Sequence, residues 1–409
     1  MHVADIFDRA VGHAPVRLRG YDGSEAGPPD AEVTIEVRSP RALAYLASAP
    51  GTLGLARAYV TGELEVGGPL YPAVRALADA TLNRIPRAEQ AAIARQLFGF
   101  RLRHRAPLPP EEARPRGRLH SLSRDRAAIS HHYDVSNRFY EWLLGPSMAY
   151  TCAVFPEPDA SLELAQERKH ELVAGKLGLR PGMRLLDVGC GWGGMVMHAA
   201  ERHGVQALGV TLSRQQAEWA QKAIAERGLG ELAEVRHLDY REVTESGFDA
   251  ISSIGLTEHI GRAQLPAYFG LLYGKLRPGG RLLNHCITQP DGSGPQRTDP
   301  FIDRYVFPDG QLHCIGLLVS QMNDAGFEIR HEENFREHYA RTLAHWLANL
   351  EARWEDAVTE VGETRARVWR LYLASSQLGF ELNNVQLHQV LGVRLDSAGQ
   401  SHMPWLPDW

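Results

Sequence analysis

Apolar positions recur along this chain with two different spacings, and the alternation between the spacings predicts the order of its elements. Five apolar runs have the length of buried strands, at 183–188, 207–211, 233–238, 248–254 and 280–287. Three stretches with helical spacing lie between them, at 195–203, 213–227 and 263–276. This alternation predicts an α/β fold with a doubly wound sheet, whose ligand lies at the carboxyl ends of the strands.

The first hundred residues carry a different pattern. Alternating stretches at 16–19 and 33–37 flank a turn rich in glycine and proline, which predicts a β-hairpin. Helical spacing then covers 40–49, 52–60, 69–82 and 88–98. No acid–base or ligand-binding constellation occurs in this part of the sequence. We therefore predict that residues 1–100 form a small α/β domain that holds substrate or another subunit.

The remainder of the chain predicts a single larger domain over 129–409. An aromatic-rich helix begins near Phe139, and Ser161 can cap the next helix. Residues 289–320 interrupt the rhythm with prolines and glycines, a composition that favours a lid insertion over a pocket. A strand at 326–329, helices at 340–358 and 363–381, and an apolar segment at 389–395 follow. We expect the last segment to close the edge of the sheet.

A basic segment rich in proline, 101–128, connects the two predicted domains. Eight arginines stand there against Glu111, Glu112 and Asp125. Two interpretations remain open. The segment is either a solvated tether or a contact with an anionic membrane surface, where each basic residue contributes about 1 kcal/mol.

Composition limits the class of protein. The chain has 409 residues, 44% of them hydrophobic and 23% charged, which is typical of a globular protein of two domains. A net charge of -5 argues against a nucleic-acid partner. The apolar runs are shorter than a membrane span, the first residues lack a signal-peptide pattern, and the four cysteines are scattered. We expect a cytoplasmic protein with reduced thiols, and the spacing of the histidines predicts no metal site.

The glycine-dense stretch 185–194 is the strongest candidate for a ligand-binding loop, because a strand leads into it and a helix follows. A dinucleotide site would need a carboxylate about 20 residues beyond the first glycine, and residues 208–213 contain none. Asp187 leads the loop, and its charge suits the sulfonium of S-adenosylmethionine better than a pyrophosphate. The alternative is that Asp187 only holds the loop's own backbone. Asp239 and Tyr240 offer a carboxylate and a stacking ring for adenine.

Five motifs in this order resemble the cyclopropane fatty-acyl-phospholipid synthase family, which includes the mycolic acid cyclopropane synthases. They are Tyr150-Thr151-Cys152, 186–194, Gly209-Val210-Thr211-Leu212-Ser213 with Gln216, Glu258-His259-Ile260-Gly261 and His285-Cys286-Ile287. The resemblance covers 129–395, and the N-terminal part resembles the small lipid-associated domain of the longer bacterial members. It implies a Rossmann-like class I S-adenosylmethionine-dependent methyltransferase with that small α/β domain in front.

The resemblance also implies which residues act. The methyl donor would contact Tyr150, Thr151, Gly189, Gly191, Thr211, Leu212, Gln216, Tyr240 and Ile254. The cis double bond of an acyl chain attacks the methyl group and leaves a carbocation, and a bound bicarbonate takes the proton. The residues that match the holders of this bicarbonate are Cys152, Glu258, His285, Ile287 (through its backbone) and Tyr339.

The chemistry of an alkene is consistent with this assignment. An alkene needs proximity and exclusion of water rather than a base for its attack. Aromatic faces can stabilise the cation by about 2 kcal/mol, and the candidates are Tyr133, Phe139, Tyr150 and Tyr339. Glu258 and His285 can hold an anion only if one of them carries a proton.

Structural alternatives exist for these residues. Cys152 can be a buried apolar residue, His285 a structural histidine, and Glu258 part of a charge pair with His259 at a helix start. His131 and His132 fit a pocket wall.

The residues before Glu258 depart from the family pattern, because Gly255-Leu256-Thr257 stands where an aromatic residue usually precedes the glutamate. Thr257 can change how the cation collapses, to a cyclopropane or to an exocyclic methylene of the 10-methylene stearoyl type. The second product implies a separate flavin- and NADPH-dependent reductase as partner. We expect an oleoyl-type phospholipid substrate, a homodimer and a position at the inner face of the membrane. A methyltransferase of a soluble metabolite and a non-catalytic lipid-binding protein are the alternatives.

Overall fold

The computed structural model describes residues 2–49, 51–82, 87–113, 136–292 and 299–409, which form two compact units. The first unit comprises Met1–Arg114, Asp299–Pro308 and Leu350–Leu378, and the second comprises Pro115–Thr298, Asp309–Asn349 and Gly379–Trp409. The sequence analysis expected two continuous domains, whereas two later segments pack with the N-terminal part. The basic segment beyond residue 113 lies largely outside the described residues.

The first unit is built on a small mixed sheet with strand order β2-β1-β3-β4. Its strands are β1 (Arg17–Gly20), β2 (Glu25–Ala26), β3 (Thr34–Val37) and β4 (Leu64–Gly67). The predicted hairpin between 16–19 and 33–37 is wrong, because β1 and β3 are parallel. A tight turn at Gly23 pairs β2 with β1 instead, so the chain returns to the start of β1 before β3 begins.

The helices of the first unit are α1 (Val3–Ala10), α2 (Pro40–Ser48), α3 (Thr52–Val60), α4 (Leu70–Leu82), α5 (Arg87–Arg103), α12 (Pro300–Tyr305) and α15 (Trp354–Val361), with most of α16 (Glu363–Glu381). The four helices expected over 40–98 are confirmed in α2 to α5. Ser39 caps α2 by accepting from the amide of Arg41.

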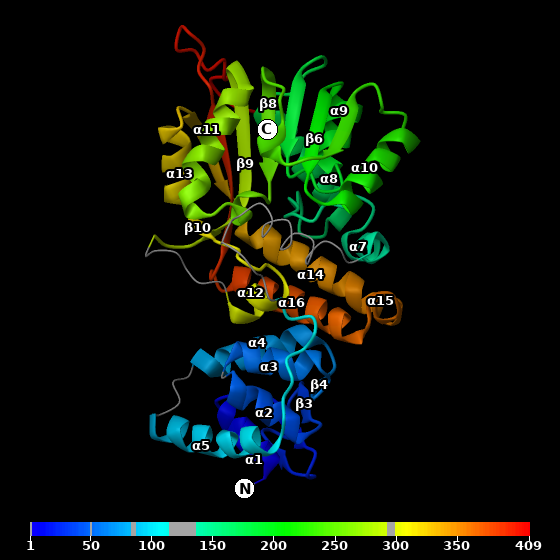
Figure 1. Ribbon diagram of the computed structural model, residues 1–409, viewed down its shortest axis with the longest axis vertical. Helices are drawn as coiled ribbons and strands as arrows, with labels where there is room; N and C mark the ends of the chain where they lie inside the picture. Colours follow the sequence, from blue (N-terminus) through cyan, green and yellow to red (C-terminus); the bar gives the residue numbers. More distant parts are fainter. Residues whose placement is uncertain (1, 50, 83–86, 114–135, 293–298) are drawn as a thin grey trace. The chain divides into compact units, whose positions relative to one another are not determined.

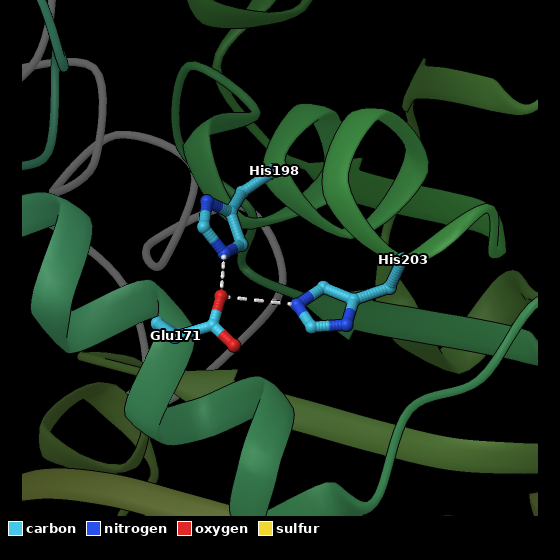
Figure 2. Close-up of side chains that lie close together, drawn as sticks. All are labelled: Glu171, His198 and His203. Carbon is cyan, nitrogen blue, oxygen red and sulfur yellow. Dashed lines mark hydrogen bonds and ion pairs between the residues drawn. The ribbon is translucent and has the colours of Figure 1, made fainter.

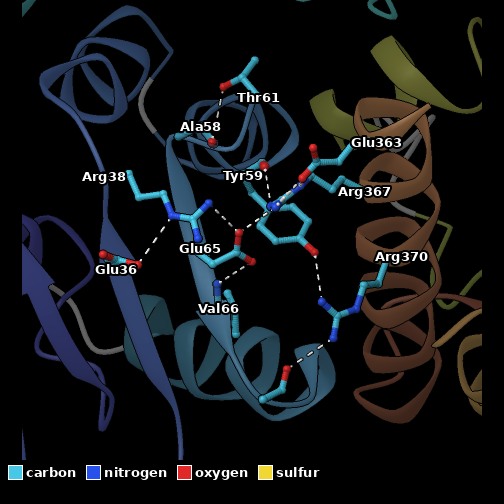
Figure 3. A network of polar contacts seen from close by, with 11 residues as sticks. Glu36, Arg38, Ala58, Tyr59, Thr61, Glu65, Val66, Glu363, Arg367 and Arg370 are labelled. Carbon is cyan, nitrogen blue, oxygen red and sulfur yellow. Dashed lines mark hydrogen bonds and ion pairs between the residues drawn. The ribbon is translucent and has the colours of Figure 1, made fainter. Parts of the chain in front are cut away.

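Two arginines of α16, the buried Arg367 and the half-buried Arg370, attach this helix to α3 and to β4 with the residue after it (Figure 3). Nη2 of Arg367 lies 2.6 Å from Oε2 of Glu65 in β4, and the arginine side chain is only 7% exposed. Arg370 donates to the hydroxyl of Tyr59 at 3.4 Å and to the carbonyl of Gly68 at 3.3 Å. Because a buried charge without its partner is costly, these pairs bind residues more than 300 positions apart into one core.

The second unit is organised around an eight-stranded sheet with order β11-β12-β9-β8-β5-β6-β7, and β10 pairs with β9. The strands are β5 (Arg184–Val188), β6 (Gln206–Thr211), β7 (Ala233–His237), β8 (Phe248–Ile254), β9 (Leu276–Gln289), β10 (His313–Cys314), β11 (Glu328–Asn334) and β12 (Gln386–Val393). The five strands β5 to β9 are parallel, which confirms the predicted doubly wound sheet.

Helices cover both faces of this sheet (Figure 1). On one face, α8 (Leu162–Leu177), α9 (Gly194–His203) and α10 (Arg214–Glu226) enclose an apolar core with β5 to β7. On the other face, α11 (Leu265–Lys275) and α13 (Ile315–Asp324) enclose a second core. Two further helices, α7 (Asn137–Leu144) and most of α14 (Arg336–Ala352), complete the unit.

One expectation for the C-terminal region needs correction, and the predicted lid insertion stays a prediction. The last apolar segment forms β12, but it lies between β9 and β11 rather than at the sheet edge, because both of its neighbours pair with it antiparallel. The predicted insertion at 289–320 contains the start of a regular helix, α13, which packs on the sheet. Within the described residues, no helix combines the length and the apolar character needed to cross a bilayer.

Candidate active site

A cavity of about 330 Å³ opens at the carboxyl ends of β5, β6, β7 and β8. The glycine loop forms one wall, and Gly189, Gly191 and Gly193 have φ angles of 73°, 55° and 78°. Such angles favour glycine over other residues. A Cβ on Gly189 would lie 3.2 Å from Leu256, whereas no protein atom lies within 4 Å of one on Gly191. The open space at Gly191 lets a ligand approach the backbone closely.

Most residues predicted to contact the methyl donor line this cavity. They are Tyr150, Thr151, Asp187, Gly189, Gly191, Thr211, Leu212, Gln216, Tyr240 and Ile254. The hydroxyl of Thr211 donates to Oε1 of Gln216 at 2.8 Å, and Ser213 caps α10. Asp239 is not among the residues that line the cavity, although Leu238 and Tyr240 on either side of it are. Its buried carboxylate accepts three hydrogen bonds from Arg241, so it holds the guanidinium that lines the cavity in its place.

Asp187 places a buried carboxylate on the floor of the cavity. Asp187 is the second-last residue of β5. Its carboxylate accepts a hydrogen bond of 2.6 Å from Ser252 on the neighbouring strand β8. Burial raises the pKa of Asp187 to about 6, and the Ser252 hydrogen bond and nearby Lys169 oppose this rise. At neutral pH the group is therefore mainly a carboxylate, and a cationic ligand would be attracted to it.

Lys169 and His170 of α8 also line the cavity, and the sequence analysis did not select them. Nζ of Lys169 donates to Oγ1 of Thr151 at 2.9 Å. Burial lowers its pKa to about 8. A signal was present in the sequence, because Gln166, Lys169, His170 and Lys176 recur at helical spacing on the face of α8 that is buried. Buried polar residues on one helical face are typical of a site.

The five residues predicted to hold the catalytic anion do not belong to the cavity wall as far as the described residues define it. Two of them are in direct contact, since the amide of Ile287 donates to Oε1 of Glu258 at 2.8 Å. This bond occupies the Ile287 backbone group that was expected to face the anion. Burial raises the pKa of Glu258 to about 7, and the Ile287 bond opposes the rise.

Two of the predicted anion-site residues have a polar atom without a hydrogen-bond partner among the described residues. Oε2 of Glu258 and Nε2 of His285 are both buried without a hydrogen bond. His285 and Ile287 lie two positions apart on β9, so their side chains are on the same face of the sheet. Unpaired buried polar atoms are rare in proteins and commonly indicate a missing ligand or water.

A chain of buried hydrogen bonds determines which ring nitrogen of His285 carries the proton. Lys176 donates to Oε1 of Gln389 at 2.7 Å, which turns the amide nitrogen of Gln389 toward His285. That nitrogen lies 3.1 Å from Nδ1 of His285. Because an amide nitrogen can only donate, Nδ1 must accept, and the neutral ring carries its proton on Nε2. Burial and the charge of Lys169 hold the pKa of His285 well below its usual range.

Cys152 and Tyr339 lie on the side of this region formed by α14. The thiol of Cys152 is fully buried and lies 3.2 Å from the carbonyl of Ala153 and 3.8 Å from that of Phe335. Burial raises the pKa of the thiol, and the charge of Lys169 opposes this. Tyr339 lies one helical turn after Phe335. The centroid of its ring is 4.6 Å from that of the Phe380 ring. The assignment of both residues to the anion site stays a prediction.

The predicted aromatic faces are partly present. The ring of Tyr150 lies 5.2 Å from Trp346 and 6.0 Å from Tyr140. Phe139 is buried beside Tyr140. His131, His132 and Tyr133 lie outside the described residues. Thr257 is buried, and its hydroxyl donates to Oδ1 of Asn284 at 2.6 Å. This residue therefore places a polar group, rather than an apolar surface, next to Glu258 in the chain.

The residues present fit an adenosyl sulfonium donor. The cavity combines an acidic floor at Asp187, an open glycine backbone and the ring of Tyr240, which can stack on a base. A doubly wound sheet with a glycine loop after its central strand and such a cavity at the strand ends defines the class I S-adenosylmethionine-dependent methyltransferases. A solved mycolic acid cyclopropane synthase, CmaA1, complexed with SAH and CTAB, has this fold with 33% identity and a TM-score of 0.62, over 65% of this chain and 97% of that one.

Residues 120–390 match the mycolic acid cyclopropane synthetase family. A probable fatty acid methyltransferase of Mycobacterium tuberculosis is 52% identical over 419 residues, covering 100% of this chain and 97% of the relative. A tuberculostearic acid methyltransferase of the same organism is 31% identical over 93% of this chain and 88% of its own length. The chain therefore belongs to the mycolic acid cyclopropane synthetase family, and it is an S-adenosylmethionine-dependent methyltransferase.

Proposed function

We propose that this enzyme transfers a methyl or methylene group from S-adenosylmethionine to the cis double bond of an unsaturated, oleoyl-type chain in a phospholipid. The resulting carbocation loses a proton to a bound bicarbonate. The product is a methylene-branched acyl chain of the 10-methylene stearoyl type or a cyclopropane. The donor supplies an electrophilic methyl group. The protein positions the double bond against it, excludes water and holds an acceptor for the proton.

The unpaired atoms of Glu258 and His285 are the observation that carries this proposal. Neutral His285 presents Nε2–H as a donor because Gln389 occupies Nδ1. Glu258, with a pKa of about 7, can carry a proton on Oε2 at neutral pH. Two buried donors suit a small anion such as bicarbonate. A methyltransferase of a soluble O- or N-nucleophile would have no use for such a pair.

The first unit supports a membrane-bound substrate. On α5, the side chains of Phe98 and Leu102 are 54% and 72% exposed, and they lie one helical turn apart. Arg101, Arg103 and Arg105 surround them and are exposed. Exposed apolar residues among arginines suit an anionic bilayer surface. We propose peripheral attachment to the inner face of the membrane through this surface.

Two further proposals concern partners. If the product is the methylene, a separate flavin- and NADPH-dependent reductase completes the methyl branch. The tuberculostearic acid methyltransferase among the relatives, at 31% identity, supports the methylene product. The hydroxyl of Thr257 beside Glu258 supports it too, since it replaces an aromatic face with a polar group near the cation. We also propose a homodimer.

The test uses the full chain, S-adenosylmethionine and vesicles of dioleoyl phospholipid. Mass spectrometry should show one added CH2 per modified acyl chain, and NMR of the extracted lipid should show an exocyclic methylene rather than a cyclopropane ring. Glu258→Gln should bind S-adenosylhomocysteine as the unchanged enzyme does and lose turnover. Glu218→Gln, on the exposed side of α10, should keep both.

Two outcomes would contradict the proposal. Absence of any mass shift with donor binding intact would exclude the alkene substrate. Full turnover of Glu258→Gln would exclude the anion site. Methylation of a soluble amine or hydroxyl instead would favour the metabolite methyltransferase.

A further inference from the structure

A second cluster of polar side chains lies on the outer side of α8 and α9, away from the residues assigned above. Glu171 of α8 and His198 and His203 of α9 direct their polar ends at one point (Figure 2). Oε2 of Glu171 lies 3.1 Å from Nε2 of His198 and 3.1 Å from Nε2 of His203. The ligand atoms all lie within 4.8 Å of one another.

We propose that Glu171, His198 and His203 form a binding site for a transition-metal dication of the zinc type. Two imidazoles and one carboxylate are a common ligand set for Zn²⁺. Tetrahedral coordination at zinc–ligand distances of about 2.0–2.2 Å separates neighbouring ligand atoms by roughly 3.3 Å. The two separations from Glu171 are 3.1 Å, close to that value, and the two histidine nitrogens lie within 4.8 Å of each other, so side-chain movements would admit the ion.

The ligand set also selects the metal. Mg²⁺ and Ca²⁺ prefer six or more oxygen ligands, and this cluster offers one carboxylate among the described residues. Imidazole nitrogens favour Zn²⁺, Co²⁺, Ni²⁺ and Cu²⁺. The side chain of Glu171 is 47% exposed, whereas those of His198 and His203 are 10% and 19% exposed. The fourth coordination position therefore faces solvent and would hold water.

Neighbouring contacts hold the three ligands in place. Arg202 of α9 pairs with Glu167 of α8 at 2.8 Å, about one helical turn from Glu171, so the two helices are already fixed side by side. His203 is the last residue of α9. The carbonyl end of a helix carries partial negative charge, which favours a cation there.

Metal binding would clamp α8 to α9, the two helices behind the glycine loop. His170, next to Glu171, lines the donor cavity, and its ring lies 5.5 Å from that of His198. The spacing of histidines along the sequence did not predict this site because Glu171 precedes His198 by 27 positions and comes from another helix. Only the packing of α8 on α9 brings the ligands together.

The test measures metal binding by the full chain after treatment with a chelator. Titration with ZnCl2 against a chromophoric chelator should give one tight equivalent per chain. CoCl2 should give the intense visible absorption of tetrahedral Co²⁺. Glu171→Gln and His203→Gln should each weaken zinc binding by at least about 10–100-fold, the range known for loss of an outer-shell partner.

Glu167→Gln is the matched control, because it breaks the neighbouring ion pair between the same helices and removes no ligand. It should keep the full zinc affinity. One equivalent of zinc should raise the melting temperature of the unchanged chain and of Glu167→Gln by about 2–4 °C, and leave that of His203→Gln unchanged. Equal zinc affinity in all variants, or less than one equivalent in the unchanged chain, would overturn the site and leave an ion-paired cluster only. No readout uses donor or lipid, so failure here is distinct from failure of the proposed function.

Discussion

The amide nitrogen of Gln389 donates a hydrogen bond to Nδ1 of His285 over 3.1 Å, and this contact decides which ring nitrogen of His285 carries the proton. Lys176 fixes the amide by binding its oxygen at 2.7 Å. The residue that orients His285 thus comes from β12, the antiparallel neighbour of β9.

Gln389→Leu should lower turnover about 10–100-fold and leave donor affinity unchanged. Leucine keeps the volume but releases Nδ1, so His285 can adopt the tautomer that no longer offers Nε2–H. Nitrogen-15 NMR of the histidines should show the change in tautomer directly. Gln386→Leu, three residues earlier on β12, is the control and should have full activity. An unchanged tautomer with lost activity would contradict this role.

Asp187→Asn should raise the stability of the folded chain and lower its affinity for the methyl donor. Burial raises the pKa of Asp187 to about 6 in the folded chain. A raised pKa means that this group favours folding at low pH, and that its contribution is lost as the pH rises from the unfolded value toward 6. The asparagine variant should therefore match the unchanged chain near pH 4 and become more stable than it by on the order of 2 kcal/mol above pH 6.

Thermal denaturation across that pH range measures the difference for Asp187→Asn. Affinity for S-adenosylmethionine should fall in the same variant by about 10-fold or more, because the sulfonium loses its counter-charge. Asp159→Asn, at an exposed position, serves as the control. A constant stability difference at all pH values would mean that Asp187 does not titrate as the structure implies.

Lys169 should make donor binding depend on pH. Its buried ammonium, with a pKa of about 8, lines the same cavity as the sulfonium would. As the pH rises through 8 the like charge disappears, so the affinity ratio of S-adenosylmethionine to its neutral product S-adenosylhomocysteine should rise on the order of 10-fold. Taking the ratio cancels the titration of the ligands' amino groups. In Lys169→Met the ratio should already be high at pH 7 and stay flat; a slope that persists would assign it to another group.

The double substitution Phe98→Ser and Leu102→Ser should release the enzyme from vesicles. Each apolar side chain contributes about 1.5–3 kcal/mol when fully buried, so partitioning onto anionic vesicles should fall at least about 10-fold in flotation assays. Turnover of lipid should fall in parallel, with donor affinity unchanged. Leu164→Ser, an exposed leucine of the second unit, is the control. Unchanged flotation would place the membrane contact elsewhere.

Local sequence patterns were sufficient to predict most helices and strands of the second unit. The apolar run predicted at 248–254 is β8 to the residue, and Ser161 caps the helix after it as predicted. The glycine loop and the family resemblance predicted most of the residues that line the cavity. These features depend on neighbours in sequence, which is why they could be predicted.

Features that depend on distant partners could not be predicted in this way. The role of Gln389 requires a partner 104 positions away, and the parallel pairing of β1 with β3 depends on a short strand that the pattern did not reveal.

The discontinuous first unit has a consequence for synthesis of the chain on the ribosome. Glu65 emerges early, but its partner Arg367 is made about 300 residues later. The N-terminal sheet therefore keeps this side of its core open until α16 has been made. The parallel strands β5 to β9 of the larger sheet are all made before α16, so they can assemble while the first unit is still incomplete.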